Sequence, residues 1–216
     1  MDKFRISAFV ITLITIILSL YKTLTQNNSE SANDYHPDTK DKNITNKIMW
    51  YFSQITYQSE FLILIYFGLR IFTKYKFDIL FATIAPYCLT KNIHYFYLLY
   101  PKYAKKLNTN LSKLDYSNLS IHLIDTIFII LEAMSITYKF SYLLFHLVYI
   151  IFAIFIILLN KSFRNTWSYN FLNLNNLDGW SYVYIYILTN QIFSFFLYFI
   201  NKLYNNKNYI NTLLGK

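Results

Sequence analysis

Long apolar runs alternate with short polar segments along this chain. A helix needs about 20 mostly apolar residues to cross the hydrocarbon of a bilayer. The sequence meets this requirement about six times and therefore predicts an all-α fold, a polytopic membrane helical bundle. We expect a single transmembrane domain over residues 1–216, with spans at about 4–24, 47–73, 77–100, 118–138, 140–160 and 181–203.

The polar segments between these runs organise the predicted bundle. Residues 25–46, 101–117 and 161–180 connect successive spans on one side of the membrane, and the fourth and fifth spans follow each other closely enough for a tight helical hairpin. Pro86 falls in the third span, where neighbouring helices can accommodate it. The basic N-terminus ahead of the first run also fits a signal peptide, but no small-residue cleavage site follows, so we expect a retained span.

Composition supports a membrane protein and excludes several other classes. Hydrophobic residues make up 55% of the chain and charged residues 14%, which are too few to cover a water-exposed surface. The scarcity of glycine and proline, with 3 of each, excludes collagen-like and low-complexity chains and disfavours a turn-rich β-fold. The single cysteine, Cys88, can build neither an internal disulfide nor a zinc site, and we expect no metal and no cofactor.

The formal net charge of +9 comes from Lys and Arg in the short connecting segments. Membrane proteins place basic residues there, and the sequence has no basic helix or aromatic RNA-binding motif. We therefore expect membrane lipids as partners and no nucleic acid. Lys and Arg are divided almost equally between the two sides, so they do not set the orientation, and the sequence does not predict an oligomeric state.

Ionisable side chains occur inside the predicted spans, where they are costly and usually face the bundle interior. They are Glu60, Lys91, His94, His122, Asp125, Glu132 and His146. At a rise of about 1.5 Å per residue, Thr56, His94 and His122 lie roughly 6 to 14 Å deep, measured from the membrane face that carries the three connecting segments. The three residues can therefore share one layer, on the same side as the Trp167–Tyr169 segment.

Two interpretations of these polar residues are open. In the structural one, buried ion pairs hold the helices together, with Lys91 paired to one of the acids. In the functional one, a threonine hydroxyl is a nucleophile that becomes reactive when a histidine takes its proton. Helical spacing places Glu60 one turn after Thr56 and Asp125 one turn after His122. Asp125 could therefore orient His122 or form a structural pair.

Four sequence segments resemble motifs of the androgen-induced-protein family, in the family's order and over nearly the whole chain. SQITYQSEFLILIYFG, from Ser53, resembles the K-Y-L-T-F-x-D/N segment of the second span and aligns the family threonine with Thr56. Tyr100–Lys102 resembles a Y-P-K motif after the third span. NLSIHLIDTIFIILEAM resembles N-H-x-x-H-T…F-I-L-I-E-M, and TWSYNFL resembles G-x-W-x-Y-P-F-L. The positions matched in the last two segments are Asn118, His122, Phe128, Glu132, Met134, Trp167, Tyr169, Phe171 and Leu172.

The resemblance implies a membrane threonine hydrolase that cleaves fatty acid esters of hydroxy fatty acids. Thr56 would be the nucleophile and His122 the general base. The supporting or substrate-lining residues would be Glu60, His94, Asp125, Glu132, Trp167 and Tyr169. The chain departs from the family pattern at Leu119, Leu123, Ile127 and Asn170, which affects the expected substrate more than the chemistry. An endomembrane such as the endoplasmic reticulum, or the plasma membrane, is the expected location.

The alternative is a non-enzymatic membrane protein, such as a small transporter, a channel subunit or a scaffold. Its buried charges would then serve transport or packing. Internal repeats or glycine-rich, unwound half-helices would favour a transporter. The sequence shows neither. The hydrolase is the preferred hypothesis, because Thr56 and His122 fall at comparable depth and match the pair that the resemblance implies.

Overall fold

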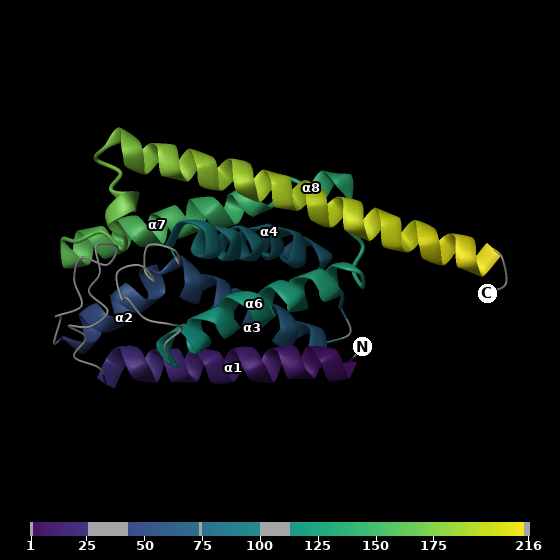
Figure 1. Ribbon diagram of the computed structural model, residues 1–216, viewed down its shortest axis with the longest axis horizontal. Coiled ribbons are helices and arrows are strands. Elements are labelled where there is room, and N and C mark those ends of the chain that lie inside the picture. The colour runs from purple at the N-terminus through teal and green to yellow at the C-terminus, as the bar shows by residue number, and fades with distance from the viewer. Residues whose placement is uncertain (1, 26–42, 74, 100–112, 214–216) are drawn as a thin grey trace. The chain divides into compact units, whose positions relative to one another are not determined.

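The computed structural model describes residues 2–25, 43–73, 75–99 and 113–213, which are largely helical and include no strand (Figure 1). The predicted all-α class is therefore confirmed. The elements are α1 (Asp2–Thr25), α2 (Ile44–Ser53), α3 (Ile55–Phe72), α4 (Asp78–His94), the π-helical turn η1 (Tyr95–Leu99), α6 (Lys113–Ala133), the 3-10 turn η2 (Phe140–Tyr142), α7 (His146–Arg164), the 3-10 turn η3 (Asn170–Leu172) and α8 (Leu177–Leu213).

The chain divides into two compact units. Unit 1 comprises Met1–Thr73 and Tyr149–Leu188, and unit 2 comprises Lys74–Val148 and Thr189–Lys216. The long helix α8 therefore contributes its first part to unit 1 and the rest to unit 2. Helix α7 belongs to unit 1 except for its first three residues.

Four helical segments of the described chain are long and apolar enough to cross a membrane. They are Lys3–Thr25, Ile55–Phe72, Phe140–Arg164 and Leu177–Asn206. Large apolar side chains stay exposed along them at helical spacing, as on α7 at Val148, Ile151, Phe152 and Phe155. Exposed apolar faces of this length are suited to lipid, so the chain is a membrane-embedded protein.

Helices α4 and α6 are shorter or more polar than these four. Helix α4 has 17 residues and contains Lys91, Asn92 and His94, and α6 contains His122 and Asp125. That both helices also cross the membrane, to give about six spans in one transmembrane domain, stays a prediction.

The second expected span, 47–73, is wrong as a single helix, because the structure divides it into α2 and α3. Gln54, between them, has an extended backbone with φ −79° and ψ 126°. A break in a membrane helix leaves backbone groups without their usual partners. Here side chains supply some of them, because the Gln58 amide donates to Phe52 O at 2.9 Å and the Ile55 N–H donates to the Tyr169 hydroxyl at 3.1 Å.

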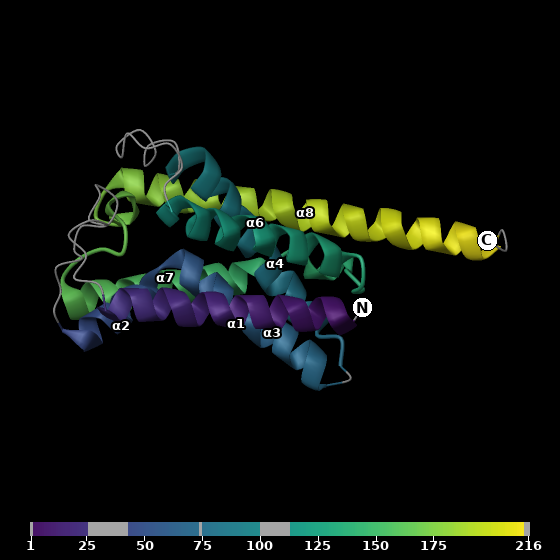
Figure 2. The same cartoon turned by 60° about the horizontal axis from the view of Figure 1, so that its bottom comes forward.

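Unit 1 is built on α1, which packs along α3 and also contacts α2 (Figure 2). The Phe4 ring meets the edge of Phe67, and Phe9 lies next to Gly68, where an added Cβ would come within 3.2 Å of the Phe9 ring. The hydroxyls of Ser19 on α1 and Tyr51 on α2 lie 2.7 Å apart. Aromatic packing and this hydrogen bond therefore hold both halves of the divided span against α1.

A second cluster in unit 1 fixes the segment between α7 and α8. Its buried members are Ile157, Tyr169, Leu172 and Val183, and Ile55, Trp167 and Phe171 are among the residues that pack on them. Gly179 permits a close approach here, because a Cβ at this position would collide with the backbone of Asn173. The connecting segment is thus packed against both helices and against the start of α3.

Unit 2 is built on α4, which packs along α6. Helix α6 ends at Ala133, five residues before the expected end of the fourth span. Asn201 of α8 stabilises this end, because its amide donates to Ala133 O and Ile136 O, each at 2.8 Å, and accepts from the Tyr138 N–H at 3.1 Å. The carbonyl groups at a helix end need such partners, and Asn201 bonds the last carbonyl of α6 as well as two backbone groups of the segment that follows.

Candidate active site

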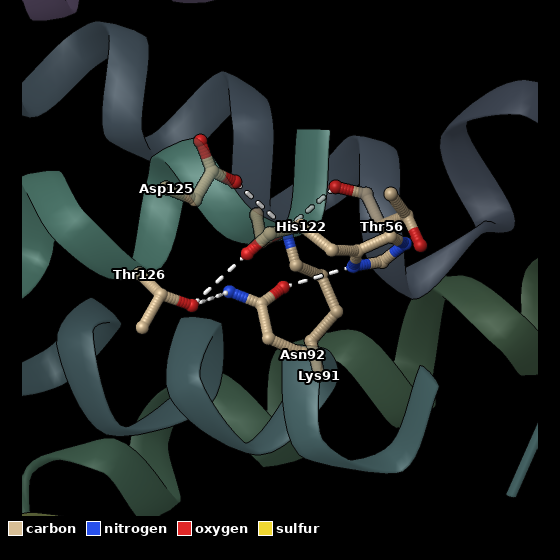
Figure 3. Close-up of polar contacts among 7 residues, drawn as sticks. Thr56, Lys91, Asn92, His122, Asp125 and Thr126 are labelled. Atoms are coloured by element: carbon tan, nitrogen blue, oxygen red, sulfur yellow. Dashed lines mark hydrogen bonds and ion pairs between the residues drawn. The ribbon is translucent and has the colours of Figure 1, made fainter. Parts of the chain in front are cut away.

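The imidazole of His122 lies at the centre of a hydrogen-bonded cluster in unit 2. His122 is on α6 and is buried, with 3% of its surface exposed. Its Nδ1 lies 2.9 Å from Oδ1 of Asn92 on α4 (Figure 3). The Asn92 amide Nδ2 donates to Thr126 Oγ1 at 2.7 Å, and Thr126 Oγ1 donates to His122 O at 2.9 Å. The ring is therefore connected to α4 and, through Thr126, back to its own backbone.

An aromatic side chain fixes the plane of the same ring. Tyr95 stacks on His122 with 3.8 Å between ring centroids and 11° between planes, and the Phe96 ring approaches its edge at 6.1 Å. Both aromatic residues belong to η1, the π-helical turn that follows α4. A π turn changes the direction of successive side chains and is frequent at functional sites. Here it contributes two consecutive rings to the surroundings of His122.

Asp125 is bound to Lys91, as the structural interpretation expected for one of the acids. Lys91 Nζ and Asp125 Oδ2 lie 2.8 Å apart, and the two side chains are only 2% and 4% exposed. The opposite charges compensate one another inside the protein. Of the two roles open for Asp125, the structure shows the ion pair, and it is Asn92 that contacts the His122 ring.

The two other expected residues of unit 2 are buried at separate places. His94 Nε2 lies 3.4 Å from Thr189 Oγ1 on α8. Glu132 is fully buried near the end of α6, roughly 15 Å along the helix from His122 at the usual rise per residue. Glu132 is therefore separated from His122 along its own helix.

Thr56 lies in unit 1, in the first turn of α3 and directly after the break at Gln54. It is partly buried, and its hydroxyl makes no hydrogen bond within the described part of the chain. The first N–H groups of a helix lack intrahelical partners, and the helix dipole is positive there. The break therefore places the Thr56 hydroxyl beside a helix end that favours negative charge.

The Trp167–Tyr169 segment holds this helix end in place. In addition to the bond from Ile55 N to the Tyr169 hydroxyl, the Gln54 amide donates to Ser168 O at 3.3 Å. Ser168 Oγ accepts from Asn160 Nδ2 of α7 at 3.2 Å, and Trp167 packs against the adjoining apolar cluster. The segment that the sequence placed on the same side of the membrane as Thr56 therefore bonds the two residues just before Thr56, within unit 1.

Glu60 lies one turn after Thr56 on α3 and is 1% exposed. Its burial confirms that this acid faces the protein interior, as expected of an ionisable residue in a membrane helix. The Thr56–His122 dyad joins residues of different units and stays a prediction.

Sequence analysis missed Asn92, Thr126 and Gln54. Asparagine occurs throughout the sequence, so nothing distinguishes Asn92 before its contact with His122, 30 residues further along the chain, is known. Thr126 follows His122 by one helical turn, and that spacing could have indicated it. Gln54 had no signal, because the run around it is free of glycine and proline.

The comparisons with known proteins add no relative. No family model, curated protein or solved structure matches the sequence. The resemblance to the androgen-induced-protein family therefore stays a prediction, and its Tyr100–Lys102 motif lies outside the described residues. Within the described ranges, no group of three or more His, Cys, Asp or Glu side chains could hold a metal ion.

Proposed function

We propose that this protein is an integral membrane hydrolase of fatty acid esters of hydroxy fatty acids, with Thr56 as nucleophile and His122 as general base. The observation that carries the proposal is the state of the His122 ring. Its Nδ1 is bound to Asn92, its plane is held by Tyr95, and its Nε2 makes no hydrogen bond to any described residue. A general base needs one oriented nitrogen and one nitrogen able to accept a proton.

The reaction would proceed through an acyl-enzyme. His122 Nε2 takes the Thr56 hydroxyl proton while Thr56 Oγ bonds to the ester carbonyl carbon. The tetrahedral intermediate then expels the alkoxide of the hydroxy fatty acid, which takes the proton from His122. Water, deprotonated by the same nitrogen, attacks the Thr56 ester. The second intermediate then releases the fatty acid by breaking its bond to Thr56 Oγ, which takes the proton from His122.

The surroundings of Thr56 support its role. Backbone N–H groups in the first turn of α3 and the positive end of its dipole favour the negative charge that develops on the carbonyl oxygen. The exposed apolar faces of the spans place the protein in the bilayer, where long-chain esters dissolve. The proposed location is an endomembrane, such as the endoplasmic reticulum, or the plasma membrane.

The test uses purified protein in lipid nanodiscs and a fatty acid ester of a hydroxy fatty acid. Thr56→Ala and His122→Ala should each lower kcat by about 10³-fold or more, as loss of a nucleophile or its base does in other acyl-transfer enzymes. Thr83→Ala is the matched control, because the Thr83 hydroxyl only bonds Ile79 O on its own helix, at 2.9 Å. Turnover at the wild-type rate by both variants would refute the proposal.

The second candidate is a non-enzymatic transporter, channel subunit or scaffold. The buried Lys91–Asp125 pair favours it, since ionisable groups inside membrane proteins also mark transport pathways or hold helices together. A fluorophosphonate probe distinguishes the two candidates. A hydrolase should be labelled, and Thr56→Ala should remove the label, whereas a non-enzymatic protein should not be labelled at all.

A further inference from the structure

We propose that Asn92 is a positioning residue that holds His122 in the tautomer with hydrogen on Nδ1, and that Thr126 fixes the orientation of the Asn92 amide. The inference rests on the proposed function only for its catalytic consequence. The tautomer itself follows from three contacts inside unit 2, between Asn92, His122 and Thr126.

Only one assignment of donors and acceptors makes all three contacts hydrogen bonds. Thr126 donates its only hydroxyl hydrogen to His122 O, so it must accept from the Asn92 amide nitrogen. The Asn92 carbonyl oxygen then faces His122 Nδ1 and requires a hydrogen there. Nε2 is left with its lone pair, which is the form that a general base needs.

The opposite assignment of donors and acceptors loses one of the three hydrogen bonds. If the Asn92 amide is turned over, its nitrogen faces His122 Nδ1 and its oxygen faces Thr126. The Thr126 hydroxyl must then donate to Asn92 and gives up its bond to His122 O. The ring would carry its hydrogen on Nε2 and could not accept the proton of a nucleophile. The Thr126 hydroxyl therefore favours the orientation of Asn92 that activates the base.

Among the described side chains, Asn92 is the hydrogen-bond partner of His122 Nδ1, and Asp125, the residue that spacing suggested, is bound to Lys91 at 2.8 Å. Tyr95 stacking fixes the plane of the ring but leaves both tautomers possible. An amide selects one tautomer without adding a charge to the buried site. Asn92 thus does for His122 what a carboxylate does for many catalytic histidines.

The first experiment reads the tautomer directly and requires no turnover. Solid-state NMR of ¹⁵N-histidine-labelled protein in nanodiscs at neutral pH reports whether each ring nitrogen carries a hydrogen. The chain has 4 histidines, and His122→Gln identifies the signal. Wild type should show a protonated Nδ1 and an unprotonated Nε2. Asn92→Leu should shift His122 toward hydrogen on Nε2, whereas Asn92→Asp, which keeps an acceptor, should preserve the wild-type tautomer.

The second experiment measures kcat and KM for the fatty ester. Asn92→Leu and Thr126→Val should lower kcat about 10- to 100-fold with little change in KM, as loss of an orienting partner does at other sites, and Asn92→Asp and Thr126→Ser should restore most of it. Thr90→Val is the matched control. The Thr90 hydroxyl is buried and bonds Pro86 O on its own helix at 2.9 Å, as Thr126 bonds His122 O, but it has no bond to Asn92.

Two NMR results would overturn the inference: hydrogen on Nε2 of His122 in the wild type, or an unchanged His122 tautomer in both Asn92→Leu and Thr126→Val. If the Asn92→Leu protein does not fold, the His122 tautomer in Thr126→Val and in Asn92→Asp tests the inference. Absence of ester turnover in the wild type, with the expected tautomer in the spectra, would refute the proposed hydrolase and support the positioning of His122 by Asn92.

Discussion

The polar groups around Thr56 and those around His122 are organised differently. At the start of α3 in unit 1, side chains bond to backbone atoms, as when Gln54 donates to Ser168 O and Tyr169 accepts from Ile55 N. Around His122 in unit 2, side chains bond mainly to one another, as in the Lys91–Asp125 pair and the contact of Asn92 with His122, and Thr126 adds a bond to the His122 backbone.

The difference shows what each region keeps in place. The contacts of unit 1 hold the start of a helix, and with it the position of the Thr56 hydroxyl. Those of unit 2 hold the His122 ring, the hydrogen on one of its nitrogens, and the charge of Lys91 beside Asp125. Damage to unit 1 should therefore move a backbone, whereas damage to unit 2 should leave a buried group without its partner, which costs more when that group is charged.

The largest expected effect is on the ion pair of unit 2. Asp125→Leu removes the carboxylate that lies 2.8 Å from the buried Lys91 ammonium, and should lower the free energy of unfolding by about 3 kcal/mol. The double variant Lys91→Met/Asp125→Leu should recover most of this loss, because two apolar side chains can replace a buried pair. Thermal and denaturant unfolding in detergent measure both. Equal destabilisation by the single and double variants would contradict this account of the pair.

An intermediate effect is expected at the helix start of unit 1. Tyr169→Phe removes the hydroxyl that accepts from Ile55 N, and an unsatisfied buried N–H costs about 1–3 kcal/mol. If the hydrolase proposal is correct, kcat should also fall, because the helix start moves with Thr56. Tyr184→Phe is the control, since Tyr184 is in the same unit but 63% exposed. Similar stability of the two variants would show that the Tyr169 hydroxyl does not hold the break.

The apolar runs predicted where most helices lie, because crossing hydrocarbon requires about 20 apolar residues in sequence. They could not predict the break at Gln54. That break depends on Ser168 and Tyr169, 114 residues away in the chain, and no local signal marks it. Nor could they predict that α8 continues to Leu213, because its last turns are polar and lie beyond the apolar run.

As with the fold, only part of the candidate site could be predicted from the sequence. The cost of burying charge predicted that Lys91 would pair with an acid, but the choice of Asp125 required the packing of α4 on α6. The order of the spans predicted that the Trp167–Tyr169 segment lies on the same side of the membrane as Thr56, whereas its hydrogen bonds to the start of α3 depend on the fold of the connecting segment. Depth along a helix thus follows from sequence, and the partner across the interface does not.

The smallest expected effect comes from a variant that distinguishes the role of the Ser168 backbone from that of its side chain. Ser168→Ala removes the acceptor of Asn160 Nδ2 but keeps the carbonyl to which Gln54 donates. Stability should fall by only about 1 kcal/mol, the usual contribution of one hydrogen bond, and ester turnover should stay near the wild-type rate. Ser181→Ala, at an exposed hydroxyl that bonds only Leu177 O on its own helix, is the control for thermal unfolding. A large loss of turnover in Ser168→Ala would mean that the Ser168 hydroxyl, and not the backbone of its segment, positions the start of α3, and unit 1 would then depend on side-chain contacts as unit 2 does.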